Sequence, residues 1–190
     1  MTLRIIALLL LLIACAGCSG DSEKAVLVDY CFDESMGEPQ MLPVLAQPGV
    51  HSLGAGWHVS EKGGRWILGY KAVVECFLAG RNLELELVCS TSPSLSELGQ
   101  GLTVRLNGQP VARFALTDGW APDTTTVILP ADVIVQGTNT IELRPEIAGE
   151  DPELDGKAIF VRRLRVTARL DRKARRLLAD MAGRAPEDTY

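Results

Sequence analysis

Hydrophobic and polar residues alternate along much of this chain, which is the pattern of β-strands that bury one face. The clearest case is the segment 83–89, in which Leu83, Leu85 and Leu87 share one parity and Glu84 and Glu86 take the other. Shorter runs of the same kind predict further strands, at 25–31, 64–78 with a bend at Gly69, 102–106, 110–116, 124–129, 140–143 and 158–168. About eight strands with short turns and no long internal helix predict an all-β, two-sheet sandwich.

Turn and loop signals separate these strands. Asn107-Gly108 is the dipeptide most typical of a two-residue hairpin turn. Pro130 to Val133 predicts one helical turn. The segments 32–49 and 90–101 are rich in proline, glycine or serine, and 145–156 is acidic, so all three are predicted to be loops. The acidic loop lacks the regular spacing of oxygen ligands found in calcium loops.

The N-terminus has the three parts of a secretory signal. One positive charge at Arg4 precedes an unbroken apolar run from Ile5 to Ile13, and small residues follow. This run is shorter than the roughly 20 residues that cross a bilayer as a helix. Leu12-Ile13-Ala14-Cys15 resembles a bacterial lipobox, in which the cysteine takes a diacylglycerol, and Cys18 is the alternative lipidation site. The prediction is a lipoprotein signal peptide at 1–14 and a lipidated tether at 15–24, with the chain anchored to the cell membrane or the outer membrane.

The C-terminal residues 169–190 show helical rather than strand periodicity. Leu170, Ala174, Leu177 and Leu178 are spaced for one helix face, with arginines and a lysine between them. The segment is predicted to be a short basic amphipathic helix and tail. Packing on its own domain is favoured over contact with anionic lipid or an acidic partner.

Composition narrows the class of protein further. The chain has 190 residues, 47% of them hydrophobic, and a formal net charge of −5. This is enough apolar material for one packed domain, predicted at 25–168. The acidic balance argues against nucleic acid as a partner, because binding nucleic acid needs a clustered basic surface.

Two cysteines within the predicted strands have two interpretations. Cys76 shares a parity with Val74 and Leu78, and Cys89 shares one with the leucines of its strand, so both are expected to face the core. In an oxidising compartment they could form a Cys76–Cys89 disulfide. Equally, they could be buried thiols that act as small hydrophobic residues.

Several segments resemble the galactose-binding-like jelly-roll modules of bacterial surface proteins and polysaccharide-handling enzymes. They are Gly56-Trp57-His58 with Glu61 and Gly64-Arg65-Trp66; the hairpin Val104 to Gly108 with Leu116 to Trp120; Leu129-Pro130 with Gly137 to Leu143; and the closing strand Ala158 to Val166. The likeness covers about residues 50–167. It implies a jelly-roll β-sandwich and, more weakly, a sugar ligand.

The candidate ligand-binding residues lie within ten positions of one another: Trp57, His58, Glu61, Arg65 and Trp66. Sugar binding needs an aromatic face for the C–H groups of the ring and polar groups for its hydroxyls, and this segment supplies both. The alternative is structural, with Trp57 and Trp66 in the core and Arg65 paired with Glu61. Trp120, after an Asp-Gly turn, is expected in the core.

No catalytic, metal or cofactor site is predicted. His51 and His58 lack a third ligand at metal spacing, and no nucleophile elbow, phosphate-binding loop or dinucleotide fingerprint occurs. The sequence therefore predicts a lipid-anchored, extracytoplasmic, non-catalytic binding module for carbohydrate or glycoconjugate. The alternative is a structural or assembly lipoprotein that contacts another cell-envelope protein.

Overall fold

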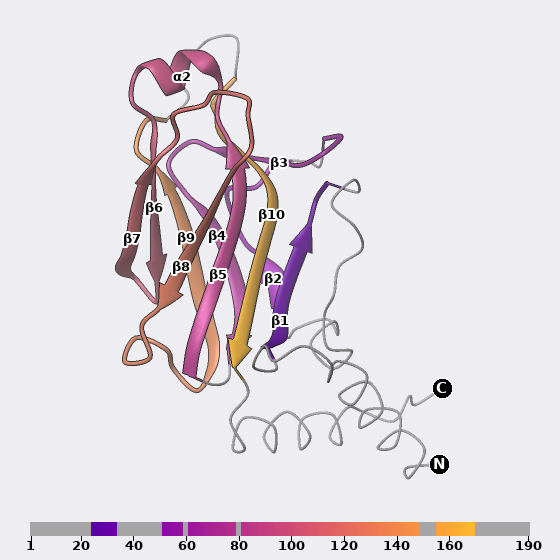
Figure 1. Cartoon of the computed structure of the whole chain (residues 1–190), viewed down its shortest axis with the longest axis vertical. Coiled ribbons are helices and arrows are strands. Elements are labelled where there is room, and N and C mark those ends of the chain that lie inside the picture. Colours follow the sequence, from indigo (N-terminus) through magenta and orange to yellow (C-terminus); the bar gives the residue numbers. More distant parts are fainter. Residues whose placement is uncertain (1–23, 34–50, 59–60, 79–80, 149–154, 170–190) are drawn as a thin grey trace.

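The computed structural model describes residues 24–33, 51–58, 61–78, 81–148 and 155–169 (Figure 1). The predicted signal peptide at 1–14, the tether up to residue 23 and the basic tail from residue 170 lie outside these residues. The same holds for residues 34–49 of the first predicted loop and residues 149–154 of the acidic loop. Within the described ranges, no helix is both long and apolar enough to pass through a membrane.

The described strands form two antiparallel sheets that face each other as a jelly-roll β-sandwich, as the sequence predicts (Figure 1). The first sheet has the order β1-β10-β5-β8, with β3 also paired to β10, and the second has the order β2-β4-β9-β6-β7. The first sheet contains β1 (Lys24–Cys31), β3 (Arg65–Leu68), β5 (Arg81–Ser90), β8 (Asp123–Leu129) and β10 (Lys157–Arg169). The second contains β2 (His51–Leu53), β4 (Ala72–Leu78), β6 (Gly101–Leu106), β7 (Gln109–Ala115) and β9 (Gly137–Pro145).

The long strand β10 organises the first sheet. One edge pairs with β5 along its length, and the other edge pairs with β3 over residues 157–161 and with β1 over 163–169. Lys24 at the start of β1 is opposite Arg169 at the end of β10. The described domain therefore begins and ends at one end of the sandwich, and α2 (Pro93–Glu97) lies at the other end (Figure 1).

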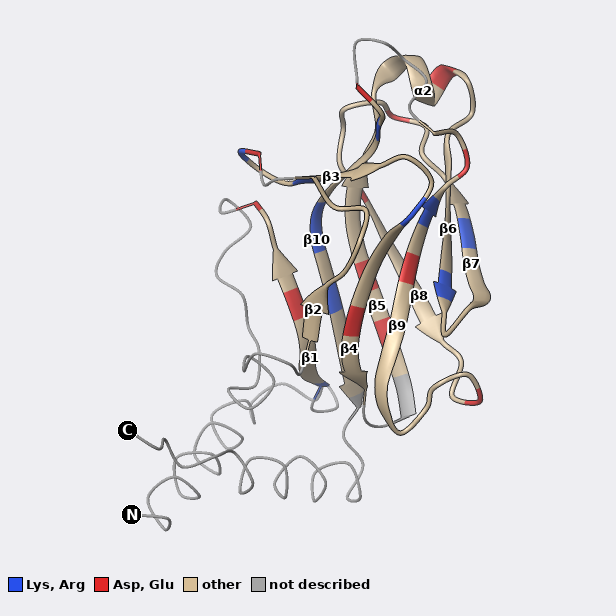
Figure 2. Cartoon of the chain, turned by 180° about the vertical axis from the view of Figure 1, so that it is seen from behind, with Lys and Arg blue, Asp and Glu red and all other residues tan. Residues whose placement is uncertain are grey.

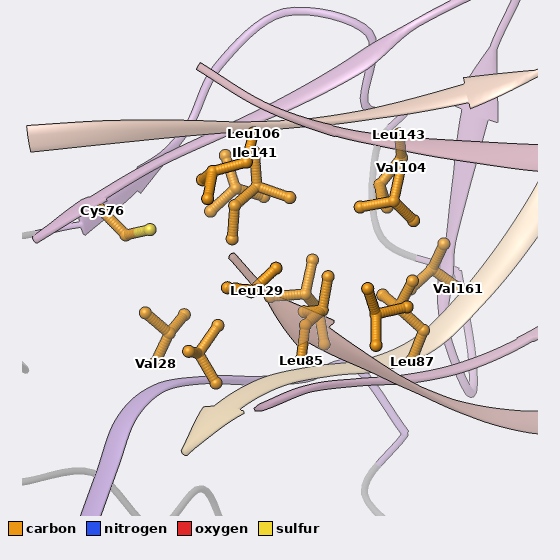
Figure 3. Close-up of a cluster of buried hydrophobic side chains, with 14 of the residues drawn as sticks. Val28, Cys76, Leu85, Leu87, Val104, Leu106, Leu129, Ile141, Leu143 and Val161 are labelled. Carbon is orange, nitrogen blue, oxygen red and sulfur yellow. The ribbon is translucent and has the colours of Figure 1, made fainter. Parts of the chain in front are cut away.

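The core between the sheets contains the side chains that the alternation assigned to it. Leu85 and Leu87 of β5 face Val104, Leu106, Ile141 and Leu143 of the second sheet, and all six are fully buried (Figure 3). Burying such a side chain stabilises the fold by roughly 1.5–3 kcal/mol. The glutamates between the leucines of β5 point to the outer face, so the register of this strand is fixed by its pattern.

Gly69 lies where the chain passes from one sheet to the other. The segment predicted as a single strand, 64–78, forms two strands, and the turn at Gly69 takes the chain from the first sheet (β3) to the second (β4). Gly69 has φ +63°, a left-handed conformation that glycine adopts at little cost. Its amide N–H donates to the carbonyl of Gly156 at 2.9 Å, which fixes this turn beside the start of β10.

Asn107 and Asn139, which belong to the segments that resemble galactose-binding-like modules, stabilise two turns. The Asn107 amide donates to Asn139 Oδ1 at 2.8 Å and accepts from the backbone N–H of Thr140 at 2.9 Å. Asn139 is fully buried, and its side chain bonds to the backbone of Val135 in both directions. These positions therefore serve turn geometry.

The segment 90–101, predicted as a loop, contains the short helix α2. Ser92 caps it by accepting from the N–H of Leu95 at 3.3 Å, Pro93 occupies its first turn, and Leu95 is buried. Both residue types favour a helix start. Five residues are too few to show a helical period, so the sequence pattern did not predict this helix. The three-residue strand β2 is likewise too short to show an alternation.

Of the two interpretations of Cys76 and Cys89, the structure contains free thiols and not the disulfide. Cys76 lies near the end of β4, whereas Cys89 lies near the end of β5, the next strand along the chain. At about 3.3 Å per residue this places them roughly 20 Å apart along the strands, and a disulfide needs Cα atoms within about 7 Å. The alternative, buried thiols within the core, is confirmed.

Candidate functional site

The five candidate binding residues do not share one face, because Arg65 and Trp66 of β3 point to opposite sides of the first sheet. Trp66 pairs with Phe160 of β10, and both project from the outer face of the first sheet, because their neighbours Ile67 and Val161 point into the core. Trp57 and Arg65 lie on the inner side instead, against Phe32. The candidate residues thus do not form one surface.

The inner group closes the rim of the sandwich. The Trp57 indole N–H donates to the carbonyl of Val73 at 2.8 Å, and its ring centroid is 5.6 Å from that of Phe32. The Arg65 guanidinium lies 5.4 Å from the centroid of the Phe32 ring, a cation–π contact. Trp57 therefore has a structural role, as the alternative interpretation proposed. The Arg65–Glu61 ion pair of that interpretation does not occur among the contacts of the described residues.

The outer group is more open and gathers residues that are distant in sequence. We call it the Trp120 cluster, and it consists of Glu61, Trp66, Trp120, Lys157 and Phe160. Trp66 is only 5% exposed, and its ring contacts Phe160 and Trp120 with centroids 5.0 and 5.6 Å away. Trp120, which was expected in the core, is 48% exposed, so that expectation is wrong.

A turn explains why Trp120 is exposed. The N–H of Ala121 donates to the carbonyl of Asp118 at 3.1 Å, and Gly119 takes the left-handed φ of +57° within this turn. The carbonyl of Gly119 accepts from the N–H of Thr91 at 3.1 Å, so the turn is fastened just before α2. The Asp-Gly dipeptide was the signal that could have placed Trp120 on a turn at the surface.

A tight hairpin places Glu61 beside Trp66. The backbones of Glu61 and Gly64 exchange two hydrogen bonds, of 3.0 and 3.1 Å. A Cβ at Gly64 would lie 2.5 Å from the Phe160 ring, so only glycine allows this approach. The indole N–H of Trp66 then donates to Glu61 Oε2 at 2.9 Å.

Lys157 completes the polar part of the cluster. Its Nζ donates to Glu61 Oε1 at 2.7 Å and lies 5.7 Å from the centroid of the Trp66 ring. The hydrogen bond from Lys157, followed by that from Trp66, lowers the pKa of Glu61. His58 Nδ1 is 3.7 Å from the same carboxylate. The Trp66 ring thus contacts a carboxylate, an ammonium group and a half-exposed indole, which are the kinds of group that recognition of a polar ligand with an apolar face requires.

Metal binding is not suggested by the described part of the chain. Within it, no three histidine, cysteine or acidic side chains come close enough together to hold an ion.

Together, the sheet order and the Trp120 cluster define a jelly-roll β-sandwich module with an aromatic and polar group at its loop-rich end. Residues 78–150 match the family model described as the first CBM domain of cellulose synthase BcsB. This stretch includes Trp120 but ends before Lys157 and Phe160. No curated protein sequence is similar enough to this chain to count as a match.

Solved structures of similar fold include carbohydrate-binding modules. A family 35 module from an environmental isolate is 19% identical, covers 60% of this chain and 74% of its own, and has a TM-score of 0.40. The module CBM36 in complex with calcium and xylotriose is 15% identical, with coverages of 60% and 92% and a TM-score of 0.42. A family 35 module from Clostridium thermocellum is 16% identical, with coverages of 64% and 94% and a TM-score of 0.40. These sequence identities and TM-scores are too low for a ligand or a binding site to be transferred to this chain. The assignment of the fold therefore rests on the strand pairing itself.

Proposed function

We propose that this protein is a non-catalytic carbohydrate-binding module and that Trp120 is its central contact with the glycan. One observation carries the proposal: the half-exposed indole of Trp120 packs on the buried ring of Trp66, which itself contacts the Glu61–Lys157 pair. The apolar face of a sugar ring stacks on such an indole, and the neighbouring carboxylate and ammonium accept from and donate to its hydroxyls. The family match over 78–150 supports the same ligand class.

This proposal revises the candidate residues. Trp66 is too buried to stack on a ligand and acts as the support for Trp120, while Glu61 remains a direct contact and His58 lies next to it. Trp57 and Arg65 are assigned to the rim of the fold. Lys157 and Trp120 are added to the site.

The experiment measures binding of the full chain, purified in detergent, to a panel of soluble polysaccharides and their oligosaccharides by affinity electrophoresis and calorimetry. Trp120→Ala is expected to weaken binding at least tenfold. Ile128→Ala, which removes an apolar side chain of similar exposure from the outer face of β8, is the matched control and is expected to bind normally. If the wild type binds no glycan, or if Trp120→Ala binds like the wild type, the proposal is wrong.

We further propose that the module works outside the cytoplasm, held to a membrane by a lipid on Cys15, with Cys18 as the alternative site. The geometry of the domain suits such an anchor. Phe160 lies nine residues along β10 from Arg169, so the Trp120 cluster is about 30 Å from the end where the described domain begins and ends. An anchor at that end would leave the cluster facing away from the membrane.

Metabolic labelling with a palmitate analogue tests the anchor. Cys15→Ser is expected to abolish labelling and Cys18→Ser to preserve it; the opposite result would move the anchor to Cys18. Labelling that survives the double variant, or is absent from the wild type, would exclude a lipid anchor without bearing on glycan binding.

A further inference from the structure

A surface pocket lies apart from the Trp120 cluster, at the edge of the second sheet. It is a surface cavity of about 210 Å³. Six residues line it: Gly99, Gly101, Arg113, Phe114, Ala115 and Glu146. Sites for drug-sized ligands measure roughly 300–1,000 Å³, so this volume suits a ligand of a single ring.

An ion pair forms one wall of this pocket. The Arg113 guanidinium, on β7, donates from Nε to Glu146 Oε1 and from its second amino group to Oε2 at 2.8 Å. The hydrogen bond from Arg113 also lowers the pKa of Glu146. Since the two charges neutralise each other, the pocket favours neither a free anion nor a free cation. Figure 2 likewise shows basic and acidic positions interspersed over the strands of this sheet.

The pair keeps hydrogen-bonding capacity for a ligand. A guanidinium has five N–H donors, and the two bonds to Glu146 leave three of them for other acceptors. The Arg113 side chain is 75% exposed, so these donors face solvent. The carboxylate accepts from Arg113 and, at 3.4 Å, from the hydroxyl of Thr103, which leaves room for about one more donor.

Two glycines shape the rest of the pocket. A Cβ at Gly99 would meet no atom within 4 Å, so this position is open, and the φ of +82° there favours glycine. A Cβ at Gly101 would lie 2.6 Å from the Glu146 carboxylate, so glycine leaves space for the ion pair. Phe114, next to Arg113 on β7, also lines the pocket, while its side chain packs against the core.

We propose that this pocket is a second binding site, which takes one neutral sugar unit through hydrogen bonds from Arg113 and Glu146 to adjacent hydroxyls. The choice of a sugar rests on the proposed function, while the site itself is separate from Trp120. Ala115 and Trp120 are five residues apart in sequence, so their Cα atoms are at most about 18 Å apart. A single oligosaccharide could thus contact both sites, or each site could bind alone.

Titration of the ¹⁵N-labelled full chain with neutral monosaccharides (glucose, galactose, mannose and xylose), followed by amide shifts, tests this site. The amides of Gly99, Gly101 and Ala115 are expected to shift and saturate with at least one of these sugars. Arg113→Ala is expected to weaken this binding at least fivefold. Gly101→Ala, which displaces the Glu146 carboxylate, is expected to do the same.

The matched control is Arg105→Ala, which removes an exposed arginine of β6 that bonds to Gly108 rather than to the pocket. It should bind like the wild type, and so should Trp120→Ala at these three amides. If no sugar shifts these amides, or if Arg113→Ala binds like the wild type, Arg113 and Glu146 form a surface ion pair only and the second site does not exist. The proposed function at Trp120 would still stand if Trp120→Ala loses oligosaccharide binding.

Discussion

The indole of Trp66 lies edge to face against that of Trp120, with ring centroids 5.6 Å apart and ring planes at 82°. The first ring is buried on the outer face of the sheet and the second is half-exposed on a turn. Edge-to-face geometry is favourable for aromatic rings. The pair therefore combines a rigid support with a surface that a ligand can reach.

This division of roles predicts unequal effects on stability. Trp66→Ala removes a buried ring and should cost about 3–5 kcal/mol of unfolding free energy. Trp120→Ala removes mainly the ring–ring contact and should cost about 0.5–1.5 kcal/mol. Urea unfolding followed by circular dichroism measures both. Equal losses for the two variants would show that Trp120 is part of the packed structure rather than a free surface.

Asn139 is predicted to be the more critical of the two asparagines in the turns. It is fully buried, and its amide bonds to Val135, Gly137 and Asn107. Asn139→Ala removes these side-chain hydrogen bonds, each of which contributes about 0.5–1.5 kcal/mol, so a loss of at least about 2 kcal/mol is expected. Exposed Gln136→Ala is the control, with an expected change below about 0.5 kcal/mol. A loss under 1 kcal/mol for Asn139→Ala would contradict the structural role of this motif.

The strands were predictable because their information is local. The alternation of Leu83, Glu84 and Leu85 marks both the strand and its buried face, and Asn107-Gly108 marks its turn through backbone geometry alone. The break at Gly69 was found, but not the change of sheet, since sheet membership depends on which distant strand supplies the hydrogen bonds.

The candidate site was less predictable because its parts are brought together by the fold. Glu61 and Lys157 are 96 residues apart in sequence and meet only because β3 pairs with β10. Trp120 was assigned to the core on its apolar character, whereas its turn exposes it. Trp57 and Trp66 looked equivalent in sequence, yet Trp57 is bridged to Ile67 and packs on the inner side of the sheet, whereas Trp66 precedes Ile67 in β3 and points to the outer face.

The two buried cysteines are predicted to be reduced and unreactive in the folded protein. Burial raises the pKa of both Cys76 and Cys89 to about 12, which removes the reactive thiolate at neutral pH. In a Cys15→Ser, Cys18→Ser, Cys31→Ser variant, which leaves only these two cysteines, maleimide should label neither thiol before unfolding, and both Cys76 and Cys89 after unfolding without reductant. Mass spectrometry counts the labels. Failure of both to react after unfolding would indicate a disulfide between them.

Stability is predicted to fall at alkaline pH. Burial raises the pKa of Tyr30 from 10.0 to about 12 and that of Cys76 from 9.0 to about 12, so the unfolded chain loses these protons before the folded chain does. The stabilising contribution is complete below about pH 9 and is lost as the pH rises toward 12. The melting temperature should drop by at least about 5 °C between pH 8 and pH 11. Cys76→Ala removes one of these groups and should reduce the drop, and an unchanged pH profile would contradict this assignment.

The buried ion pairs on the outer face of the first sheet are predicted to matter more than the exposed ones. Asp29 accepts from Arg163 at 2.7 Å and from Arg165 at 2.9 Å, and the Asp29 and Arg163 side chains are almost completely buried. Asp29→Asn breaks the buried ion pair with Arg163, and breaking a buried pair typically costs about 3–5 kcal/mol. Glu84→Gln breaks the exposed pair with Lys24 and should cost under about 1 kcal/mol. Denaturant unfolding of both variants at low and high salt separates the two cases. Added salt should nearly abolish the small loss of stability in Glu84→Gln. It should leave most of the loss in Asp29→Asn, because salt screens buried charges far less than exposed ones. A loss at Asp29 that vanishes in high salt would mean that this pair is open to solvent.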